Sequence, residues 1–81
     1  MALKVMIVED EIMAQKSLIR TLTQNFPDME VVGTSNSVKS TVSWLSEPEN
    51  HADAIFMDVE LADGESFEIF RQIEVKAKAI M

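Results

Sequence analysis

Carboxylates follow two separate apolar runs of the sequence, at the point where each run ends. The first run, residues 3–8, is followed by Glu9 and Asp10, and the second, residues 54–57, is followed by Asp58. Carboxylates brought close together repel one another unless a cation lies between them. Mg²⁺ prefers oxygen ligands and usually binds one or two carboxylates together with waters and phosphate oxygens. If the two runs are neighbouring strands, the pattern therefore indicates a Mg²⁺ site.

A divalent cation beside a carboxylate permits phosphoryl transfer to that carboxylate. The cation neutralises charge on the incoming phosphoryl group while the carboxylate attacks it and forms an acyl phosphate. Asp58 is the predicted nucleophile because it ends the more hydrophobic run. Glu9 and Asp10 are the predicted metal ligands, and the backbone carbonyl of Glu60 is placed to add a further oxygen. The sequence contains no glycine-rich phosphate loop, nucleophile elbow or histidine-based triad.

Each of these side chains also has a structural interpretation. As an alternative to metal binding, Asp10 could simply cap the helix that follows it. Asp58 could likewise simply start a turn. Glu9 could be no more than a solvated charge, Glu11 is interpreted as one, and Asp63 is interpreted as part of an Asp-Gly turn. His51, the only histidine, is expected to be a solvated loop residue and not a catalytic base.

The spacing of apolar residues predicts strands that alternate with helices. Continuous apolar runs are typical of strands covered on both faces, and apolar residues four apart are typical of helices. The expected strands are residues 3–8, 30–34, 53–58 and 78–81, and the expected helices are residues 12–26, 37–46 and 66–73. This order predicts an α/β fold, with a parallel sheet and helices on both faces. Neighbouring first and third strands would bring their ends to within about 5 Å of each other.

Three details of packing are also predicted. Trp44 is expected to be partly buried on the second helix. Phe67, Phe70 and Ile73 are expected to face the core from the third helix, with Ile69 beside them. Residues 59–64 are expected to form a loop with an acidic lining.

Length and composition narrow the range of functions. Eighty-one residues allow one domain, and a net charge of −7 argues against direct nucleic-acid binding by this segment. The absence of cysteine excludes disulfides and thiolate metal sites and fits a reducing cytoplasm. No apolar run approaches the ~20 residues of a membrane span, and the N-terminus does not have the pattern of a signal peptide. We therefore expect a cytoplasmic chain without membrane contact.

These motifs resemble those of response-regulator receiver domains in two-component systems. Residues 4–11 (Lys-Val-Met-Ile-Val-Glu-Asp-Glu) resemble the first strand and acidic turn of that family. Residues 54–64 resemble its phosphoacceptor strand and loop, and residues 67–73 its third helix. The sequences Val-Val-Gly-Thr34 and Asp-Gly-Glu-Ser-Phe67 are most similar to those of receivers attached to LytTR-type DNA-binding domains.

The resemblance implies a flavodoxin-like (βα)₅ fold and a phosphoprotein, not an enzyme that acts on an external substrate. It implies that Asp58 accepts a phosphoryl group from the phosphohistidine of a sensor histidine kinase. It also implies Mg²⁺ held by Asp10, Asp58 and the Glu60 carbonyl, with Glu9 acting through water. The receiver would then control an output domain, a DNA-binding transcription regulator being the expected kind.

The chain departs from the family pattern at its C-terminal end. Residues 1–81 are predicted to be the N-terminal portion of a receiver, ending after the fourth strand, without the family's later hydroxyl and lysine and without an effector domain. The exposed sheet edge would favour a homo-oligomer or a strand-exchanged dimer. An alternative function is therefore a phosphorylation-independent interaction or dimerisation domain. A Mg²⁺-dependent phosphatase fits less well, because Asp58-Val-Glu60 lacks the Asp-x-Asp form.

Overall fold

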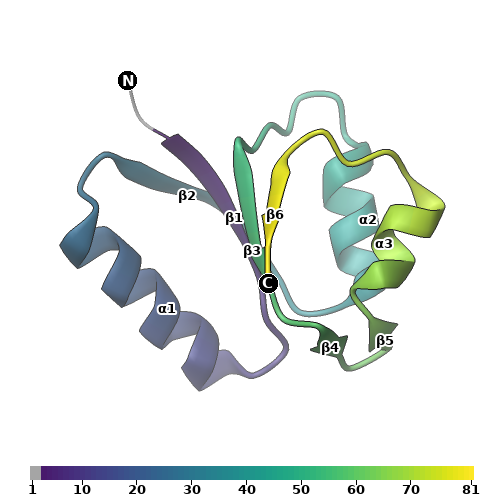
Figure 1. Ribbon diagram of the computed structural model, residues 1–81, viewed down its shortest axis with the longest axis horizontal. Helices are drawn as coiled ribbons and strands as arrows, with labels where there is room; N and C mark the ends of the chain where they lie inside the picture. The colour runs from purple at the N-terminus through teal and green to yellow at the C-terminus, as the bar shows by residue number, and fades with distance from the viewer. Residues whose placement is uncertain (1–2) are drawn as a thin grey trace.

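A four-stranded parallel sheet forms the centre of the computed structural model, which describes residues 3–81. The first two residues of the predicted 1–81 domain lie outside this part. The strand order is β2-β1-β3-β6 (Figure 1). Their bounds are β1 Leu3–Val8, β2 Met29–Ser35, β3 Ala54–Met57 and β6 Lys78–Ile80. The first and third strands are neighbours, which was the condition for the predicted metal site, and this pairing brings the two acidic strand ends together.

Helices cover both faces of the sheet, as predicted. Helix α1 (Ile12–Asn25) lies on one face, and α2 (Val38–Ser46) and α3 (Phe67–Gln72) lie on the other (Figure 1). The fold is therefore the α/β architecture expected from the sequence. No helix within residues 3–81 is both long and apolar enough to cross a membrane.

Side chains of the central strands point alternately to the two faces of the sheet and so contribute to a core on each face. Successive side chains of a strand point to opposite faces. On the side of α2 and α3, the buried cluster comprises Met6, Val8, Val38, Ala52, Ile55, Met57, Leu61 and Ile69. Val5 and Ile7 are equally buried and face the opposite side, where α1 lies. The part of β1 from Val5 to Val8 is thus covered on both faces, which accounts for the four consecutive apolar residues there.

The prediction for the core-facing side of α3 is confirmed for Ile69 and Ile73 and wrong for the two phenylalanines. Ile69 is fully buried, whereas Phe67 and Phe70 are 48% and 39% exposed. The reason is geometric, because α3 has only six residues and successive side chains are separated by about 100° around a helix axis. A helix that points Ile69 and, four residues later, Ile73 at the core turns the two phenylalanines away.

Residues 59–64 are also more ordered than predicted. Strand β4 (Glu60–Leu61) pairs antiparallel with β5 (Gly64–Glu65) to form a short hairpin directly after Asp58. Leu61 is buried in the core and anchors the hairpin. Gly64 has φ = 143°, a conformation that a residue with a Cβ atom rarely adopts. The sequence does contain a signal for this hairpin, which is the apolar Leu61 shortly before Asp63-Gly64.

Close contact between a glycine and a tryptophan joins β2 to α2. A Cβ atom built on Gly33 would lie 2.7 Å from Cε2 of Trp44, so the indole packs directly on the strand backbone. The pairing of β1 with β2 is irregular at this point, since Val5 pairs with Val31 but the next residue, Met6, pairs with Gly33. Trp44 is half-buried, as predicted.

Substitution of Gly33 by alanine tests this contact. We expect Gly33→Ala to lower the free energy of unfolding by about 1–3 kcal/mol, the usual cost of overpacking. Urea unfolding followed by far-UV circular dichroism measures it. Trp44→Leu is the control, and the double variant should recover much of the loss because the smaller side chain leaves room for the new methyl group. A Gly33→Ala protein as stable as the parent would contradict the contact.

Candidate metal centre

Parallel pairing of β1 and β3 brings the acidic residues to one edge of the sheet. Val8 lies opposite Met57, the last residue of β3. The backbone N–H of Asp58 donates to the Val8 carbonyl at 3.0 Å, and the N–H of Glu9 donates to the Ser35 carbonyl at 2.9 Å. Ladder hydrogen bonds therefore continue one residue beyond each strand and fix the backbone from which Glu9 and Asp58 project.

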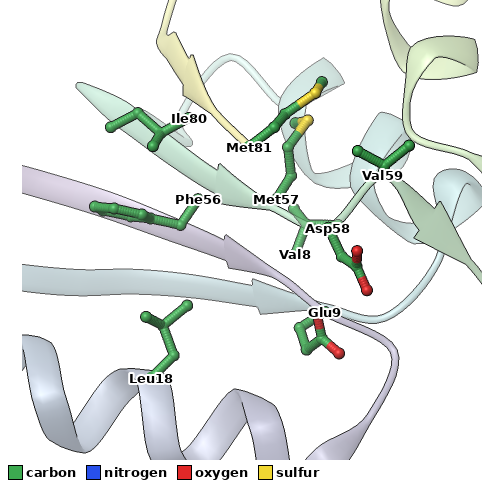
Figure 2. A pocket seen from close by; sticks show the side chains of 9 residues that line it. All are labelled: Val8, Glu9, Leu18, Phe56, Met57, Asp58, Val59, Ile80 and Met81. Carbon is green, nitrogen blue, oxygen red and sulfur yellow. The ribbon is translucent and has the colours of Figure 1, made fainter.

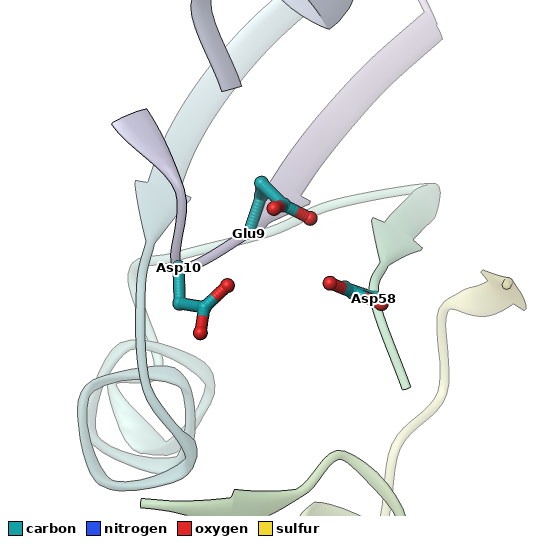
Figure 3. Close-up of side chains that lie close together, drawn as sticks. All are labelled: Glu9, Asp10 and Asp58. Carbon is teal, nitrogen blue, oxygen red and sulfur yellow. The ribbon is translucent and has the colours of Figure 1, made fainter. Parts of the chain in front are cut away.

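Three carboxylates converge at this edge. One oxygen from each of Glu9, Asp10 and Asp58 lies within 4.8 Å of the other two, and Figure 3 shows the side chains directed toward a shared space. Ligands on opposite sides of one Mg²⁺ lie about 4.2 Å apart and adjacent ligands about 3.0 Å apart, because each bond is about 2.1 Å long. The all-oxygen donor set is therefore of the kind that Mg²⁺ prefers, and the three carboxylates would have to draw closer together to bind one ion.

The electrostatics of this cluster favour a bound cation. The pKa of the Glu9 carboxyl is raised, first by burial, and then by the negative charges of Asp58 and Asp10. A hydrogen bond from the backbone N–H of Glu11, at 3.3 Å, acts in the opposite direction. Without a cation the folded chain thus holds like charges together at a cost in stability.

The acidic turn is tied to helix α1 by a side chain that sequence reasoning did not single out. The Gln15 side-chain Nε2 lies 3.2 Å from the Glu9 carbonyl oxygen and 3.4 Å from the Ser35 carbonyl oxygen. It therefore bridges the ends of β1 and β2. In the sequence it reads only as a polar helical residue, and no local signal distinguishes it.

Glu11, and not Asp10, caps the N-terminus of helix α1, which differs from the interpretations offered by the sequence. Glu11, interpreted as a solvated charge, is the N-cap of α1, and its side chain accepts from the Met13 N–H at 3.2 Å. The cap alternative for Asp10 is therefore wrong, and its carboxylate belongs to the acidic cluster instead. The cause is a one-residue offset, because α1 begins at Ile12.

Asp63 is a helix cap in addition to a hairpin-turn residue. Its Oδ1 accepts from the Val38 N–H at 2.7 Å and its Oδ2 from the Lys39 N–H at 3.0 Å, in the first turn of α2. These two backbone hydrogen bonds hold the pKa of the Asp63 carboxyl below its usual range. A structural role was predicted, but a cap on a helix 25 residues earlier was not.

The side chains of the remaining sequence candidates do not belong to the carboxylate cluster. Glu60 begins β4, opposite Glu65, with an exposed side chain. His51 is an exposed loop residue whose Nε2 lies 3.0 Å from Oδ1 of Asp53, as expected for a solvated histidine. Asp53, which precedes β3, also accepts from the Lys4 N–H at 2.8 Å, and these bonds lower its pKa.

Comparison with known proteins gives two sequence relatives. No protein-family model matches the chain. The chain is 33% identical over 67 residues to the sensory transduction protein LytT of Bacillus anthracis, and 31% identical over 67 residues to that of Bacillus cereus. Each match covers 83% of this chain and 26% of the relative. The chain therefore spans about a quarter of the length of these relatives.

The structural comparison agrees with the sequence. A solved structure of a MaeR mutant response regulator bound to sulfate matches with a TM-score of 0.82 and 18% identity, over 99% of this chain and 66% of that one. The chain has the receiver fold of response regulators and is homologous to part of LytT. The resemblance inferred from the two acidic motifs is thereby confirmed for family and fold.

A cavity of about 370 Å³ opens beside the acidic end of this receiver fold. It lies between α1 and the β3–β6 half of the sheet, and Figure 2 shows its lining. The lining residues are Val8, Glu9, Leu18, Phe56, Met57, Asp58, Val59, Ile80 and Met81. Carboxylates thus occupy one end of the cavity, and apolar side chains line the rest.

Neutralising Glu9 tests the repulsion within the cluster. We expect Glu9→Gln to raise the urea midpoint at pH 7 in the absence of Mg²⁺, because it removes a charge that the fold holds beside Asp58. A raised folded-state pKa destabilises the fold above the ordinary glutamate pKa, about 4.3, so the gain should shrink as the pH falls through the raised pKa toward that value and should be absent below it. The same variant should gain less stability from added Mg²⁺ than the parent does. An unchanged midpoint at pH 7 would count against the repulsion.

Proposed function

We propose that this chain is the phosphoacceptor module of a two-component response regulator. Asp58 takes a phosphoryl group from a sensor histidine kinase, with Mg²⁺ held by Glu9, Asp10, Asp58 and the backbone carbonyl of Glu60. One observation carries the proposal. Carboxylates from two strand ends 49 residues apart in the sequence, Glu9 and Asp58, converge with Asp10 on one point of a receiver fold.

The chemistry is a transfer between two nucleophiles. A carboxylate oxygen of Asp58 attacks phosphorus in the kinase's phosphohistidine, a P–O bond forms, and the N–P bond breaks. The electron pair of that bond leaves with the imidazole nitrogen, which takes up a proton. Asp58 suits the role of acceptor because its side chain is exposed at the mouth of the cavity, whereas its backbone is fixed by the bond to Val8.

The other two carboxylates suit the role of ion ligands. Glu9 is half-buried and its N–H is bonded to Ser35, whereas Asp10 lies in the exposed turn before α1. When bound, Mg²⁺ supplies positive charge that offsets the charge of the phosphoryl oxygens and of the three carboxylates. Charge balance thus makes phosphorylation of such an acidic site depend on the ion.

Support for the wider role comes from the relatives. Both LytT proteins are sensory transduction proteins, and MaeR is a response regulator bound to sulfate, an anion with the shape of a phosphoryl group. By analogy, residues 1–81 form the N-terminal portion of a cytoplasmic receiver, whose output domain is a DNA-binding transcription regulator elsewhere in the protein. The net charge of −7 makes direct nucleic-acid contact by this segment unfavourable. The module accepts a phosphoryl group and does not act as an enzyme on an external substrate.

Incubation with acetyl phosphate tests the acceptor role. We expect the parent chain to gain the mass of one phosphoryl group in the presence of Mg²⁺, and to gain none when the ion is chelated. Asp58→Asn should gain none under either condition. Intact-mass spectrometry measures the adduct, and its loss on treatment with hydroxylamine identifies an acyl phosphate.

Asp53 provides the matched control. It lies at the opposite end of the same strand from Asp58, so Asp53→Asn makes the same chemical change away from the acidic cluster. This variant should be phosphorylated as the parent is. An adduct of equal yield on Asp58→Asn would exclude Asp58 as the acceptor, and a parent that never reacts would favour the second function below.

The second candidate function is phosphorylation-independent self-association. Its support is an apolar surface on the α1 side of the sheet, where Phe56 is half-buried and Ile80 is 38% exposed. Strand β6 is an edge strand of the sheet, and all three of its residues are exposed. Such an edge is a template for pairing with a second chain, so a dimer formed by edge pairing or strand exchange would cover it.

Light scattering at increasing protein concentration tests this function. We expect the parent to show a mass above that of one chain, and Ile80→Lys to shift it toward the monomer, because a charged edge residue opposes strand pairing. Ile12→Lys is the control, since Ile12 is also exposed but lies at the start of α1. A parent that stays monomeric at every concentration would rule the dimer out.

A further inference from the structure

We infer that Asp63 is a positioning residue for the metal centre, because its carboxylate fastens the β4–β5 hairpin, which carries Glu60, to the first turn of α2. The inference rests on the proposed function, in which the Glu60 carbonyl is a ligand of Mg²⁺. It gives a role to a carboxylate that lies close to Asp58 in sequence but takes no part in the acidic cluster.

The contact is a two-point attachment between separate segments. Both carboxylate oxygens of Asp63 are used, one by the Val38 N–H and one by the Lys39 N–H. Hydrogen bonds from N–H groups to an ionised acceptor are among the stronger ones, and a helix N-terminus favours negative charge. Helix α2 already has a local cap, since Ser37 accepts from the Ser40 N–H at 3.0 Å. Asp63 therefore adds a connection that Ser37 cannot supply.

The position of Asp63 within the hairpin makes this attachment effective. Leu61 pairs with Gly64, so Asp63 lies in the tight turn between the two short strands. At the other end, the Ser66 N–H donates to the Val59 carbonyl at 2.8 Å. The segment that holds Glu60 is therefore secured at its base and, through Asp63, at its tip.

These contacts complete a closed ring of connections that passes through Glu9 and Asp58. Asp58 bonds to Val8, and Glu9, the next residue, bonds to Ser35. The Ser35 hydroxyl donates to the Ser37 carbonyl at 3.2 Å, and residue 38 bonds to Asp63, which leads back through the hairpin to Asp58. Loss of the Asp63 bonds opens this ring on the side that carries Glu60 and leaves the sheet pairing of β1 with β3 intact.

Titration with Mg²⁺ by calorimetry, at a temperature well below unfolding, tests the inference. Asp63→Ala should bind Mg²⁺ about tenfold more weakly than the parent, the lower end of the loss seen when residues behind metal ligands are removed. Asp63→Asn keeps one acceptor oxygen and should lie between the two. Hydrogen exchange at the Val38 and Lys39 amides should accelerate in the same order.

Asp53→Ala is the matched control. Asp53 likewise accepts a backbone N–H, that of Lys4 at 2.8 Å, but at the opposite end of β3. It should change Mg²⁺ affinity little. Equal Mg²⁺ affinity of the parent and Asp63→Ala, or equal weakening by Asp53→Ala, would overturn the positioning role and leave the proposed function standing. A parent that binds no Mg²⁺ would overturn both. If Asp63→Ala fails to fold, the ratio between the parent and Asp63→Asn decides.

Discussion

The parallel pairing of β1 with β3 is the constraint on which the rest of this structure depends. It places the residues after Val8 and Met57 at one edge, where backbone hydrogen bonds hold Glu9 and Asp58 together although their charges repel. Burial of β1 on both faces stabilises the pairing that forces this approach. The hydrophobic core therefore supplies the energy that keeps three carboxylates close enough to share a cation.

The two sides of the sheet differ in how completely they are covered. Helices α2 and α3 enclose one continuous cluster, whereas α1 alone lies on the other side and leaves Phe56 and Ile80 lining an open cavity. The same cavity has Glu9 and Asp58 at its acidic end. Charge and exposed apolar surface are thus adjacent, so an event at Asp58 and an association through β6 would act on one shared region of the molecule.

Sequence patterns predicted the parts of this structure that repeat along the chain. Apolar runs and i, i+4 spacing located the strands and helices, and they indicated that Glu9 and Asp58 would meet if the first and third strands were neighbours. Contacts between distant segments leave no regular spacing of residues in the sequence. The bonds of Asp63 to α2 and of Gln15 to two strand ends were therefore not predicted. The prediction that the phenylalanines of helix α3 face the core was wrong for another reason. At six residues it is too short for periodicity to decide which side faces the core, and the position of Ile69 decided it.

The contact of Trp44 with the bare backbone of Gly33 has a consequence for how this sequence can vary over evolution. A side chain at position 33 fits without displacing its neighbour only where position 44 carries something smaller than an indole, so position 33 depends on position 44 but not the reverse. Among homologous chains, a residue other than glycine at position 33 should therefore occur together with a smaller residue at position 44, and a lineage that has lost the tryptophan is released from the need for glycine. The order of such changes is also constrained, because the indole must go first.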